Sequence, residues 1–214
     1  MGEDAPESGN EHYFTERPTS ASRPRELRFL YRGEVLAFEA DAGVFASHGL
    51  DPGTALLIEH LSLAPEEYVL DLGCGWGAIG VACAKAAPKG RVFLTDLNRR
   101  AVRLARRNVV RNHLPNAQVR PGDGFGSVEA ERFSLIATNP PYHLGREWML
   151  KLLEAVPEHL APEGRLLLVG KGSQGIRFYQ EWLAQHWDPG VEVLGRRSGY
   201  RVLEARPKRD ARQA

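Results

Sequence analysis

Residues 68–80, YVLDLGCGWGAIG, decide the fold of this 214-residue chain. The apolar residues 68–72 are typical of a buried strand, and the small residues 77–86 predict a helix. The glycines between them let the backbone turn sharply and approach a ligand without a Cβ in the way. The stretch therefore predicts a strand, a glycine-rich loop and a helix, with the loop at the end of the strand.

The same alternation continues toward the C-terminus. Further strands are expected at residues 91–95, 118–121, 133–138 and 164–169, and further helices at residues 98–112, 146–160 and 174–185. The last two expected strands, 191–194 and 201–205, are separated only by a short turn, so they should pair antiparallel at the edge. The prediction is a doubly wound, Rossmann-like α/β domain with a seven-stranded, mostly parallel sheet and an antiparallel edge strand.

The segment before this core predicts a β-hairpin and one helix. Residues 27–31 and 35–38 are apolar runs that flank the turn Arg32-Gly33. Asp51 and Pro52 suit the N-cap and first position of a helix. We expect a domain at residues 25–208, with 25–45 as an N-terminal hairpin extension, and polar tails at 1–24 and 209–214.

Composition excludes several classes of protein. No apolar run reaches membrane-spanning length, and the first thirty residues are polar, so neither a transmembrane helix nor a signal peptide is expected. Cys74 and Cys83 form no CxxC or Cys/His cluster, which argues against a disulfide framework and a metal site and favours the cytoplasm. The net charge of +1 leaves any nucleic-acid binding to local clusters.

The glycine-rich loop fits two kinds of cofactor. Gly75, Gly77 and Gly80 match the dinucleotide fingerprint. However, Asp71 ends the preceding strand, and its carboxylate would repel a pyrophosphate but attract an amine, such as that of S-adenosylmethionine. A tight turn with only a structural role is the alternative.

Two further acids follow the next two strands. Asp96 lies nineteen residues after Gly77, a position suited to ribose hydroxyls, although it could instead cap the next helix. Asp123 could accept from an adenine amino group or serve only in a turn. The expected cofactor contacts are Asp71, Gly73, Cys74 (as a small packing residue), Gly75, Gly77, Asp96, Leu97, Asp123, Gly124 and Asn139.

Residues 137–143, ATNPPYH, form the second motif. Pro140 and Pro141 end the strand at 133–138, because neither can donate a ladder hydrogen bond. The result is a stiff turn with an amide, Asn139, and an exposed aromatic ring, Tyr142, at the sheet edge where open α/β sheets bind ligands. A plain strand-ending turn is the alternative.

Together these motifs resemble the class I S-adenosylmethionine-dependent methyltransferases with an NPPY-type motif. The resemblance is strongest to the methyltransferase small domain group, which includes 16S ribosomal RNA guanine-N2 methyltransferases of the RsmC type. It is carried by residues 12–14, 41–45, 50–54, 71–77, 139–143, 171–175 and 199–200. Larger members have an additional N-terminal domain, whereas this chain has a tail and a hairpin there, so dimerisation could replace the missing RNA-binding surface.

The resemblance implies methyl transfer to an exocyclic amino group, most simply guanine N2 of 16S ribosomal RNA. Asn139 Oδ1 and the Pro140 carbonyl would accept hydrogen bonds from the NH2 group, within the rigid turn that Pro141 completes. Catalysis would then depend on positioning more than on a strong base. Tyr142 would stack on the target base.

Basic residues suggest where RNA binds. Six arginines between residues 99 and 111 could contact phosphates, but a solvated helix face is the preferred interpretation. The expected substrate contacts are Phe45, Arg146, Lys171, Arg196 and Arg197. The expected partner is ribosomal RNA or the small ribosomal subunit, and the chain should be a monomer or homodimer.

Three alternatives stay open. The same motif would suit a protein glutamine amide, or another amino group in RNA or DNA, because each presents a planar NH2. A protein that binds the cofactor or RNA without turnover is the second alternative. A nicotinamide oxidoreductase is the third, and only the glycine fingerprint favours it.

Overall fold

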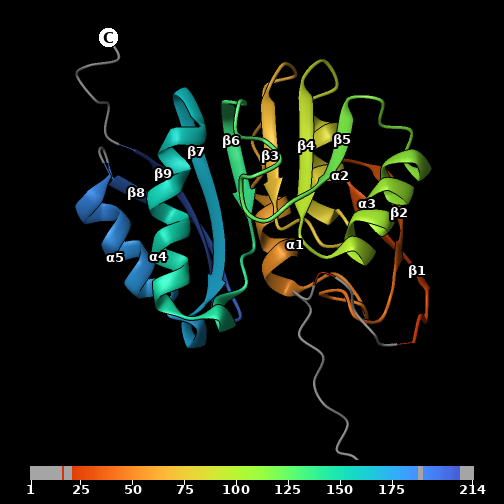
Figure 1. Ribbon diagram of the computed structural model, residues 1–214, viewed down its shortest axis with the longest axis horizontal. Coiled ribbons are helices and arrows are strands. Elements are labelled where there is room, and N and C mark those ends of the chain that lie inside the picture. Colours follow the sequence, from red (N-terminus) through yellow and green to blue (C-terminus); the bar gives the residue numbers. More distant parts are fainter. Residues whose placement is uncertain (1–15, 17–20, 188–189, 208–214) are drawn as a thin grey trace, which may run out of the picture.

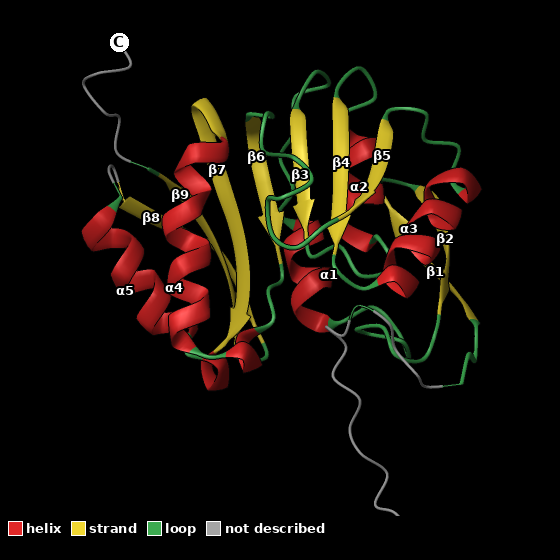
Figure 2. Cartoon of the chain, viewed as in Figure 1, coloured by secondary structure: helices red, strands yellow, loops and turns green. Residues whose placement is uncertain are grey.

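A central seven-stranded sheet with helices on both faces forms the body of the molecule, and a two-stranded sheet lies beside it (Figures 1 and 2). The computed structural model describes Glu16, residues 21–187 and residues 190–207. The strands are β1 (Arg25–Tyr31), β2 (Glu34–Ala40), β3 (Tyr68–Leu72), β4 (Arg91–Asp96), β5 (Ala117–Pro121), β6 (Phe133–Thr138), β7 (Leu160–Lys171), β8 (Gly190–Arg197) and β9 (Tyr200–Arg206). The α-helices are α1 (Pro52–Glu59), α2 (Ala78–Ala86), α3 (Arg99–Arg111), α4 (Arg146–Ala155) and α5 (Ile176–His186), and short 3-10 turns are η1 (Tyr142–Leu144), η2 (Val156–His159) and η3 (Gly172–Gln174).

The strand order of the large sheet is β5-β4-β3-β6-β7-β9-β8. Strands β3 to β7 pair in parallel, and β9 runs antiparallel to both β7 and β8. The predicted Rossmann-like fold, with antiparallel pairing at the C-terminal edge of the sheet, is confirmed. The structure adds that β9 lies between β7 and β8, so that β8 is the outermost strand.

Two differences from the predicted elements have simple causes. The helix expected at residues 146–160 ends at Ala155, and Leu160 already pairs with Phe133 as the first residue of β7. Pro157, in the 3-10 turn between them, has no N–H with which to continue the α-helix. The aromatic residues 12–14, most of the N-terminal tail and the segment 208–214 lie outside the described residues.

Each face of the sheet has its own apolar core. The hairpin and helices α1, α2 and α3 pack on one face, where Val69 and Leu94 are fully buried. Helices α4 and α5 pack on the other face, where Leu70 and Phe93 are fully buried. Adjacent strand residues point to opposite faces, so the continuous apolar runs reflect a sheet that is covered on both sides.

Two asparagines of α3 hold the hairpin against the body. The Asn108 amide accepts from Glu39 N (2.7 Å) and donates to Glu39 O (2.9 Å). The Asn112 amide does the same with Ala37 N (3.0 Å) and Ala37 O (2.7 Å). The side chains thus replace a neighbouring strand along the edge of β2, which places the following loop, residues 41–50, near the glycine-rich loop.

The carboxyl ends of β3, β4, β6 and β7 lie at one edge of the sheet, because these strands are parallel. Tyr200 at the start of β9 pairs with Lys171 at the end of β7, so the β8–β9 turn lies at this edge too. In the part of the chain that the structure describes, no helix is long and apolar enough to cross a membrane.

Candidate active site

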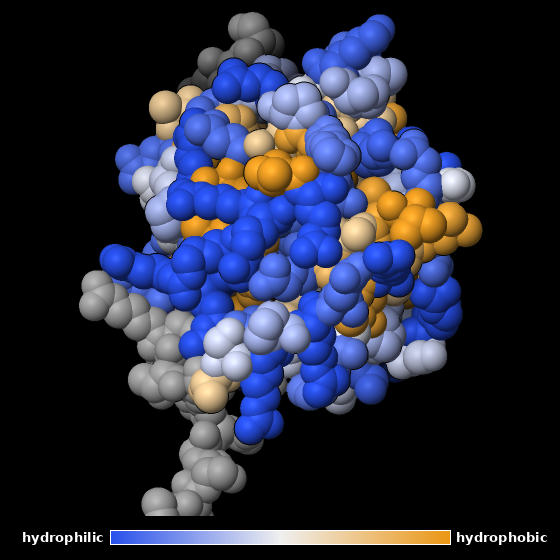
Figure 3. Space-filling view, turned by 90° about the vertical axis from the view of Figure 1, so that its right-hand side faces the viewer, coloured by the Kyte–Doolittle hydropathy of each residue, from blue (hydrophilic) through white to orange (hydrophobic). Residues whose placement is uncertain are grey.

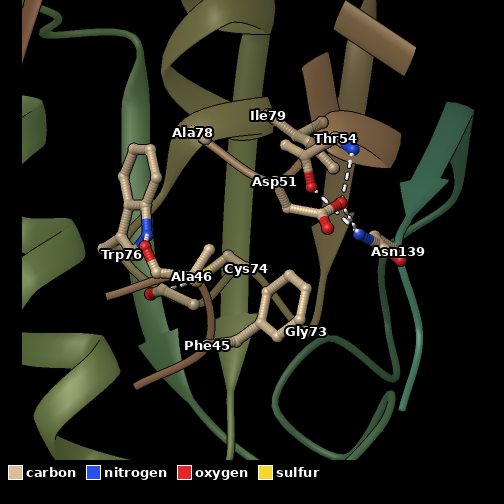
Figure 4. A pocket seen from close by; sticks show the side chains of 11 residues that line it. Phe45, Ala46, Asp51, Thr54, Gly73, Cys74, Trp76, Ala78, Ile79 and Asn139 are labelled. Atoms are coloured by element: carbon tan, nitrogen blue, oxygen red, sulfur yellow. Dashed lines mark hydrogen bonds between the residues drawn. The ribbon is translucent and has the colours of Figure 1, made fainter. Parts of the chain in front are cut away.

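Two adjoining hollows open at this edge. The first is lined by Phe45, Ala46, Asp51, Thr54, Gly73, Cys74, Gly75, Trp76, Ala78, Ile79 and Asn139 (Figure 4). The second is lined by Val44, Phe45, Gly73, Gly75, Asp96, Ala101 and Asn139. Both include Phe45, Gly73, Gly75 and Asn139, so the predicted glycine loop and the NPPY motif meet at one site.

The glycine-rich loop is held by hydrogen bonds within the protein. Gly73 N and Cys74 N both donate to Thr95 O at 2.9 Å, and Gly75 N donates to Asp96 Oδ2 at 2.8 Å. Gly73, Gly75 and Gly77 all have positive φ angles, of 72°, 55° and 93°. A Cβ at Gly73 would meet no atom within 4 Å, which indicates that this glycine faces open space in the hollow.

These bonds bear on which cofactor the loop can hold. A dinucleotide pyrophosphate is bound by free backbone N–H groups at a loop and helix N-terminus. Here the N–H groups of Gly73, Cys74 and Gly75 are already used, and Gly80 N donates to Asp71 Oδ2 at 2.7 Å. These loop donors are occupied and the Asp96 carboxylate lies against the loop, which disfavours a pyrophosphate bound through them.

Asp71 does not lie where the sequence analysis expected it. Its side chain is fully buried beneath the loop, and it does not line either hollow. Burial raises its pKa to about 7, opposed by the Gly80 hydrogen bond, and Asp96 adds a smaller increase. Its Oδ1 has no hydrogen-bond partner among the described residues. The position does not fit direct contact with a cofactor amine, and the bond from Gly80 makes Asp71 a residue that joins β3 to α2.

Asp96 lies at the floor of the second hollow. Its side chain is buried, and its Oδ2 and Oδ1 accept from Gly75 N and Asn98 N, both at 2.8 Å. The cap of α3 is Asn98, which accepts from Arg100 N and Ala101 N, so the alternative reading of Asp96 as that cap is wrong. Burial raises the pKa of Asp96. Each carboxylate oxygen keeps a lone pair for a further donor, which suits a ribose hydroxyl.

The remaining predicted cofactor residues differ in their positions. Cys74 lines the first hollow, and burial raises the pKa of its thiol well above the usual range, in keeping with a packing role. Leu97 is partly exposed beside Asp96. Gly122 N donates to Asp96 O, which brings the next loop close to this edge, but the exposed Asp123 does not line either hollow, and neither does Gly124.

S-adenosylmethionine carries a sulfonium, an amine and a ribose, so its site needs room for an extended ligand and acceptors for its hydroxyls. The second hollow offers glycines without side chains and the acid Asp96 among its lining residues. A cation is favoured near such acids. The residues therefore fit this group: Gly73 and Gly75 would leave room for it, and Asp96 would accept from its ribose hydroxyls.

Asn139 follows β6 at the rim of both hollows. Its Nδ2 donates to Asp51 Oδ2 and Thr54 Oγ1, both at 3.0 Å (Figure 4). Both bonds are made by the NH2 side of the amide, so Oδ1 is left as an acceptor. The Pro140 carbonyl accepts from Tyr142 N at 2.9 Å in a tight turn and keeps a second lone pair.

Tyr142 is not the exposed aromatic that the sequence suggested. The ring is 9% exposed, and its hydroxyl donates to Val169 O at 2.8 Å. The hydroxyl occupies space left by Gly170, where a Cβ would lie 2.3 Å from it. Stacking on a base requires an exposed ring face, and this packing leaves little of the Tyr142 ring exposed. Phe45 is 37% exposed at both hollows and is the accessible aromatic ring of the site.

Asp51, Thr54 and Tyr200 contribute to the site although no such role was predicted for them from the sequence. Asp51 was read only as a helix cap, and it is one, because it accepts from Thr54 N at 2.9 Å. It also accepts from Asn139, which is 88 residues away, and from the hydroxyl of Tyr200 at 3.4 Å. The segments 50–54 and 199–200 carried part of the family resemblance, which was the only available signal.

The basic residues fall into two groups. Arg197 forms a two-point ion pair with Glu59, at 2.8 and 2.9 Å, so its charge is already paired. Arg146 lies over the Phe178 ring at 4.2 Å, and Lys171 lies over the Tyr200 ring at 5.5 Å. Arg196 is exposed near the same turn. Arg146, Lys171 and Arg196 therefore stay as candidates for phosphate contacts.

The arginines of α3 serve mainly within the protein. Arg107 pairs with Glu39 at 3.0 Å, and Arg111 lies 3.8 Å from Glu26 and 3.9 Å from Glu39. Arg100 donates to Ala42 O at 2.6 Å. Figure 3, which views the side of the molecule with α3 and the hairpin, shows hydrophilic side chains over most of this face, with hydrophobic patches between them. These contacts favour the interpretation of a solvated helix face.

Comparisons with known proteins agree with this geometry. The model of the methyltransferase small domain family matches residues 35–204. The uncharacterized protein YbxB of Bacillus subtilis is 33% identical over 199 residues, which cover 92% of this chain and 98% of that protein. The ribosomal RNA small subunit methyltransferase C of Ectopseudomonas mendocina is 36% identical over 168 residues, 77% of this chain and 49% of that protein.

A solved structure has a similar fold. The T. thermophilus 16S rRNA N2 G1207 methyltransferase (RsmC), in complex with AdoMet and guanosine, matches with a TM-score of 0.74 and 28% identity. The match covers 88% of this chain and 51% of that chain. The chain thus spans about half the length of these ribosomal RNA methyltransferases and nearly all of YbxB. By its sequence, its sheet order and the meeting of its two motifs, the chain belongs to the methyltransferase small domain family.

Proposed function

We propose that this protein transfers a methyl group from S-adenosylmethionine to an exocyclic amino group, guanine N2 of 16S ribosomal RNA. One observation carries the proposal. The Asn139 amide is held by its NH2 side at the rim of a hollow built on the glycine loop, which leaves Oδ1 to accept from a substrate amino group. The relatives that are named as 16S ribosomal RNA methyltransferases support the choice of substrate.

The chain's own residues supply positioning. An exocyclic amino group is a poor nucleophile, because its lone pair is delocalised into the ring. Asn139 Oδ1 and the second lone pair of Pro140 O accept its two hydrogens, which favours a pyramidal nitrogen with its lone pair available. When bound, S-adenosylmethionine supplies a methyl carbon that its sulfonium already activates. Holding the two reactants in line would then supply much of the rate. The nitrogen would gain the methyl group as the methyl–sulfur bond breaks, S-adenosylhomocysteine would leave, and the nitrogen would release one proton to solvent.

The target base has a defined surface to contact. A base inside a helix must leave the stack to reach a recessed site. Phe45 offers an exposed ring at the hollow, and Tyr142 offers only the small exposed part of its ring. Stacking on such rings contributes about 1–3 kcal/mol per base. Arg146, Lys171 and Arg196 would contact the backbone of the RNA around it.

The proposal includes the setting of the reaction. The partner is ribosomal RNA, free or within the small subunit, and the compartment is the cytoplasm. The protein acts as a monomer or a homodimer. Leu97, Asp123 and Gly124 stay as proposed cofactor contacts at the adenosine end, since their loops lie next to Asp96.

The test is transfer of labelled methyl from S-adenosylmethionine to small subunits, large subunits, free 16S ribosomal RNA and a release factor. Nucleosides and amino acids of each product are then separated. The expected result is label in N2-methylguanosine of a small-subunit substrate, lost with Asn139→Ala. Label only in a glutamine of the release factor would overturn the RNA assignment and leave the chemistry. No label in any substrate, with S-adenosylhomocysteine still bound, would contradict the enzymatic function.

A further inference from the structure

We infer that Asp51 is a positioning residue for this reaction, because it fixes the Asn139 amide with Oδ1 directed toward the substrate. The inference rests on the proposed function, in which Asn139 Oδ1 accepts from the target amino group. Asp51 would then have two roles, as the N-cap of α1 and as the residue that orients Asn139 in the turn after β6.

The contacts of Asp51 are the basis of the inference. One oxygen, Oδ2, accepts from Thr54 N at 2.9 Å and from Asn139 Nδ2 at 3.0 Å. The other oxygen, Oδ1, accepts from the Tyr200 hydroxyl at 3.4 Å. The residue is partly buried, and Thr54 beside it is buried. A single side chain thus joins the start of α1, the end of β6 and the start of β9.

The orientation of the Asn139 amide follows from the chemistry of its two neighbours. An ionised carboxylate has only acceptors, so it requires the NH2 group of Asn139, and the Thr54 hydroxyl, which can donate or accept, accepts from the same NH2 group at 3.0 Å. The group that faces both must be the NH2 of Asn139, and Oδ1 must then point away from them. Figure 4 shows Nδ2 directed at Asp51 and Thr54. Without the carboxylate, a half-turn of the amide would become accessible and would present donors to a substrate that is itself a donor.

Tyr200 holds the carboxylate in turn. Its ring packs directly on Gly53, where a Cβ would lie 2.7 Å from two ring atoms. Gly53 is therefore needed for Tyr200 to approach the start of α1 closely. The packing restricts the movement of Asp51 and sets the acceptor in place before substrate binds, which is what positioning requires.

Three substitutions separate the helix cap from the positioning role. Asp51→Ser keeps a good N-cap for α1, but its hydroxyl is too short to reach Asn139 as well. Asp51→Asn keeps an amide oxygen in the place of Oδ2, where it can accept from both Thr54 N and Asn139. Asp51→Ala removes both functions. The full-length chain is used throughout, with small subunits or 16S ribosomal RNA as substrate.

The expected results differ for each variant. Asp51→Ala lowers both the melting temperature and kcat. Asp51→Ser restores most of the melting temperature, but kcat stays at least tenfold below that of the native protein, with the affinity for S-adenosylhomocysteine within about twofold. Asp51→Asn brings kcat back to within about fivefold of the native value. If Asp51→Ser restores kcat together with stability, Asp51 is a helix cap only and the inference is overturned.

A second measurement does not depend on activity. The side-chain NH2 resonances of Asn139 in a 15N-labelled protein are assigned from their loss in Asn139→Asp. They are expected to move in Asp51→Ser and Asp51→Ala and to stay near their native position in Asp51→Asn. Unmoved resonances in Asp51→Ser would show that the contact is absent and overturn the inference. If the native protein methylates no substrate, the proposed function fails by that assay, while these resonances still report on the contact.

Discussion

The cofactor half and the substrate half of the site are built in different ways. The cofactor half is local, since its acids and glycines lie within residues 71–98 and are joined largely by backbone N–H groups. The substrate half joins residues that are 88 and 149 positions apart, and side chains make every bond between them. Backbone N–H groups are the donors in the cofactor half, and their acceptors are Thr95 O and the carboxylates of Asp71 and Asp96. In the substrate half, both the donor and the acceptor of each long-range bond are side chains.

The difference teaches where each function can change. Hydrogen bonds to Thr95 O and Asp96 fix the shape of the loop. The cofactor half should therefore accept few substitutions except at residues that face open space. A side-chain network can be altered by one substitution at a time, so the substrate half is where specificity for the methyl acceptor can vary. The two halves should therefore respond separately to mutation.

The largest expected effect comes from removing the Asn139 amide. Asn139→Ala should lower kcat by about 10²–10³, the usual loss for one well-placed hydrogen-bonding group in an active site. The affinity for S-adenosylhomocysteine, measured by calorimetry, should stay within about threefold, because the loop and Asp96 are intact. An equally large loss of affinity would show that the two halves are not separate.

The next effect belongs to the cofactor half. Asp96→Asn leaves one acceptor where Gly75 N and Asn98 N need two, and it places donors against donors. The internal cost should lower stability. Loss of the proposed hydrogen bond from the ribose to a charged acceptor costs about 1.5–3 kcal/mol, so affinity for S-adenosylhomocysteine should fall about 10- to 100-fold.

Asp123→Asn is the matched comparison for this variant. Asp123 is exposed and does not line either hollow, so its proposed contact with the cofactor should be weaker than that of Asp96, and the affinity should fall less than about threefold. Equal losses in calorimetry would instead assign Asp123 a contact as strong as that of Asp96.

A third prediction concerns pH. The pKa of Asp71 is raised from 3.8 to about 7, so the folded protein holds a proton that the unfolded chain releases. Stability from this group is therefore present below about pH 4 and is lost as pH rises toward 7. The melting temperature of the native protein relative to Asp71→Asn should fall by about 3–5 °C per pH unit between pH 5 and 7. A difference that does not vary with pH would contradict the raised pKa.

The smallest effect is expected at Lys171, one of the proposed contacts with the RNA backbone. Lys171→Met should raise KM for RNA about three- to fivefold and reduce the salt dependence of binding by about one phosphate contact. Arg107→Met, a matched loss of charge on α3, should change KM less than about twofold, because Arg107 is paired with Glu39. If the two variants weaken RNA binding equally in filter binding at two salt concentrations, α3 also contacts the RNA.

Much of the fold could be predicted because its signals are local. The run of residues 68–80 contains a strand, a loop and a helix start within thirteen positions, and the structure shows β3, the glycine loop and α2 there. Turn chemistry and apolar runs belong to neighbouring residues. The helix expected to reach residue 160 ends at Ala155 because Pro157 cannot continue it, which is a local signal, whereas the pairing of Leu160 with Phe133 is not local.

The sequence by itself determined the strand–helix alternation, the glycine loop, the acid at the end of β4 and the amide turn after β6. Only the tertiary structure decided that Tyr142 is buried against Gly170, that Arg197 pairs with Glu59, and that β9 lies between β7 and β8. It also decided that Asp51 holds Asn139. The physical reason is that these contacts join distant segments, and their geometry depends on how the whole sheet assembles and which side chains then share one edge.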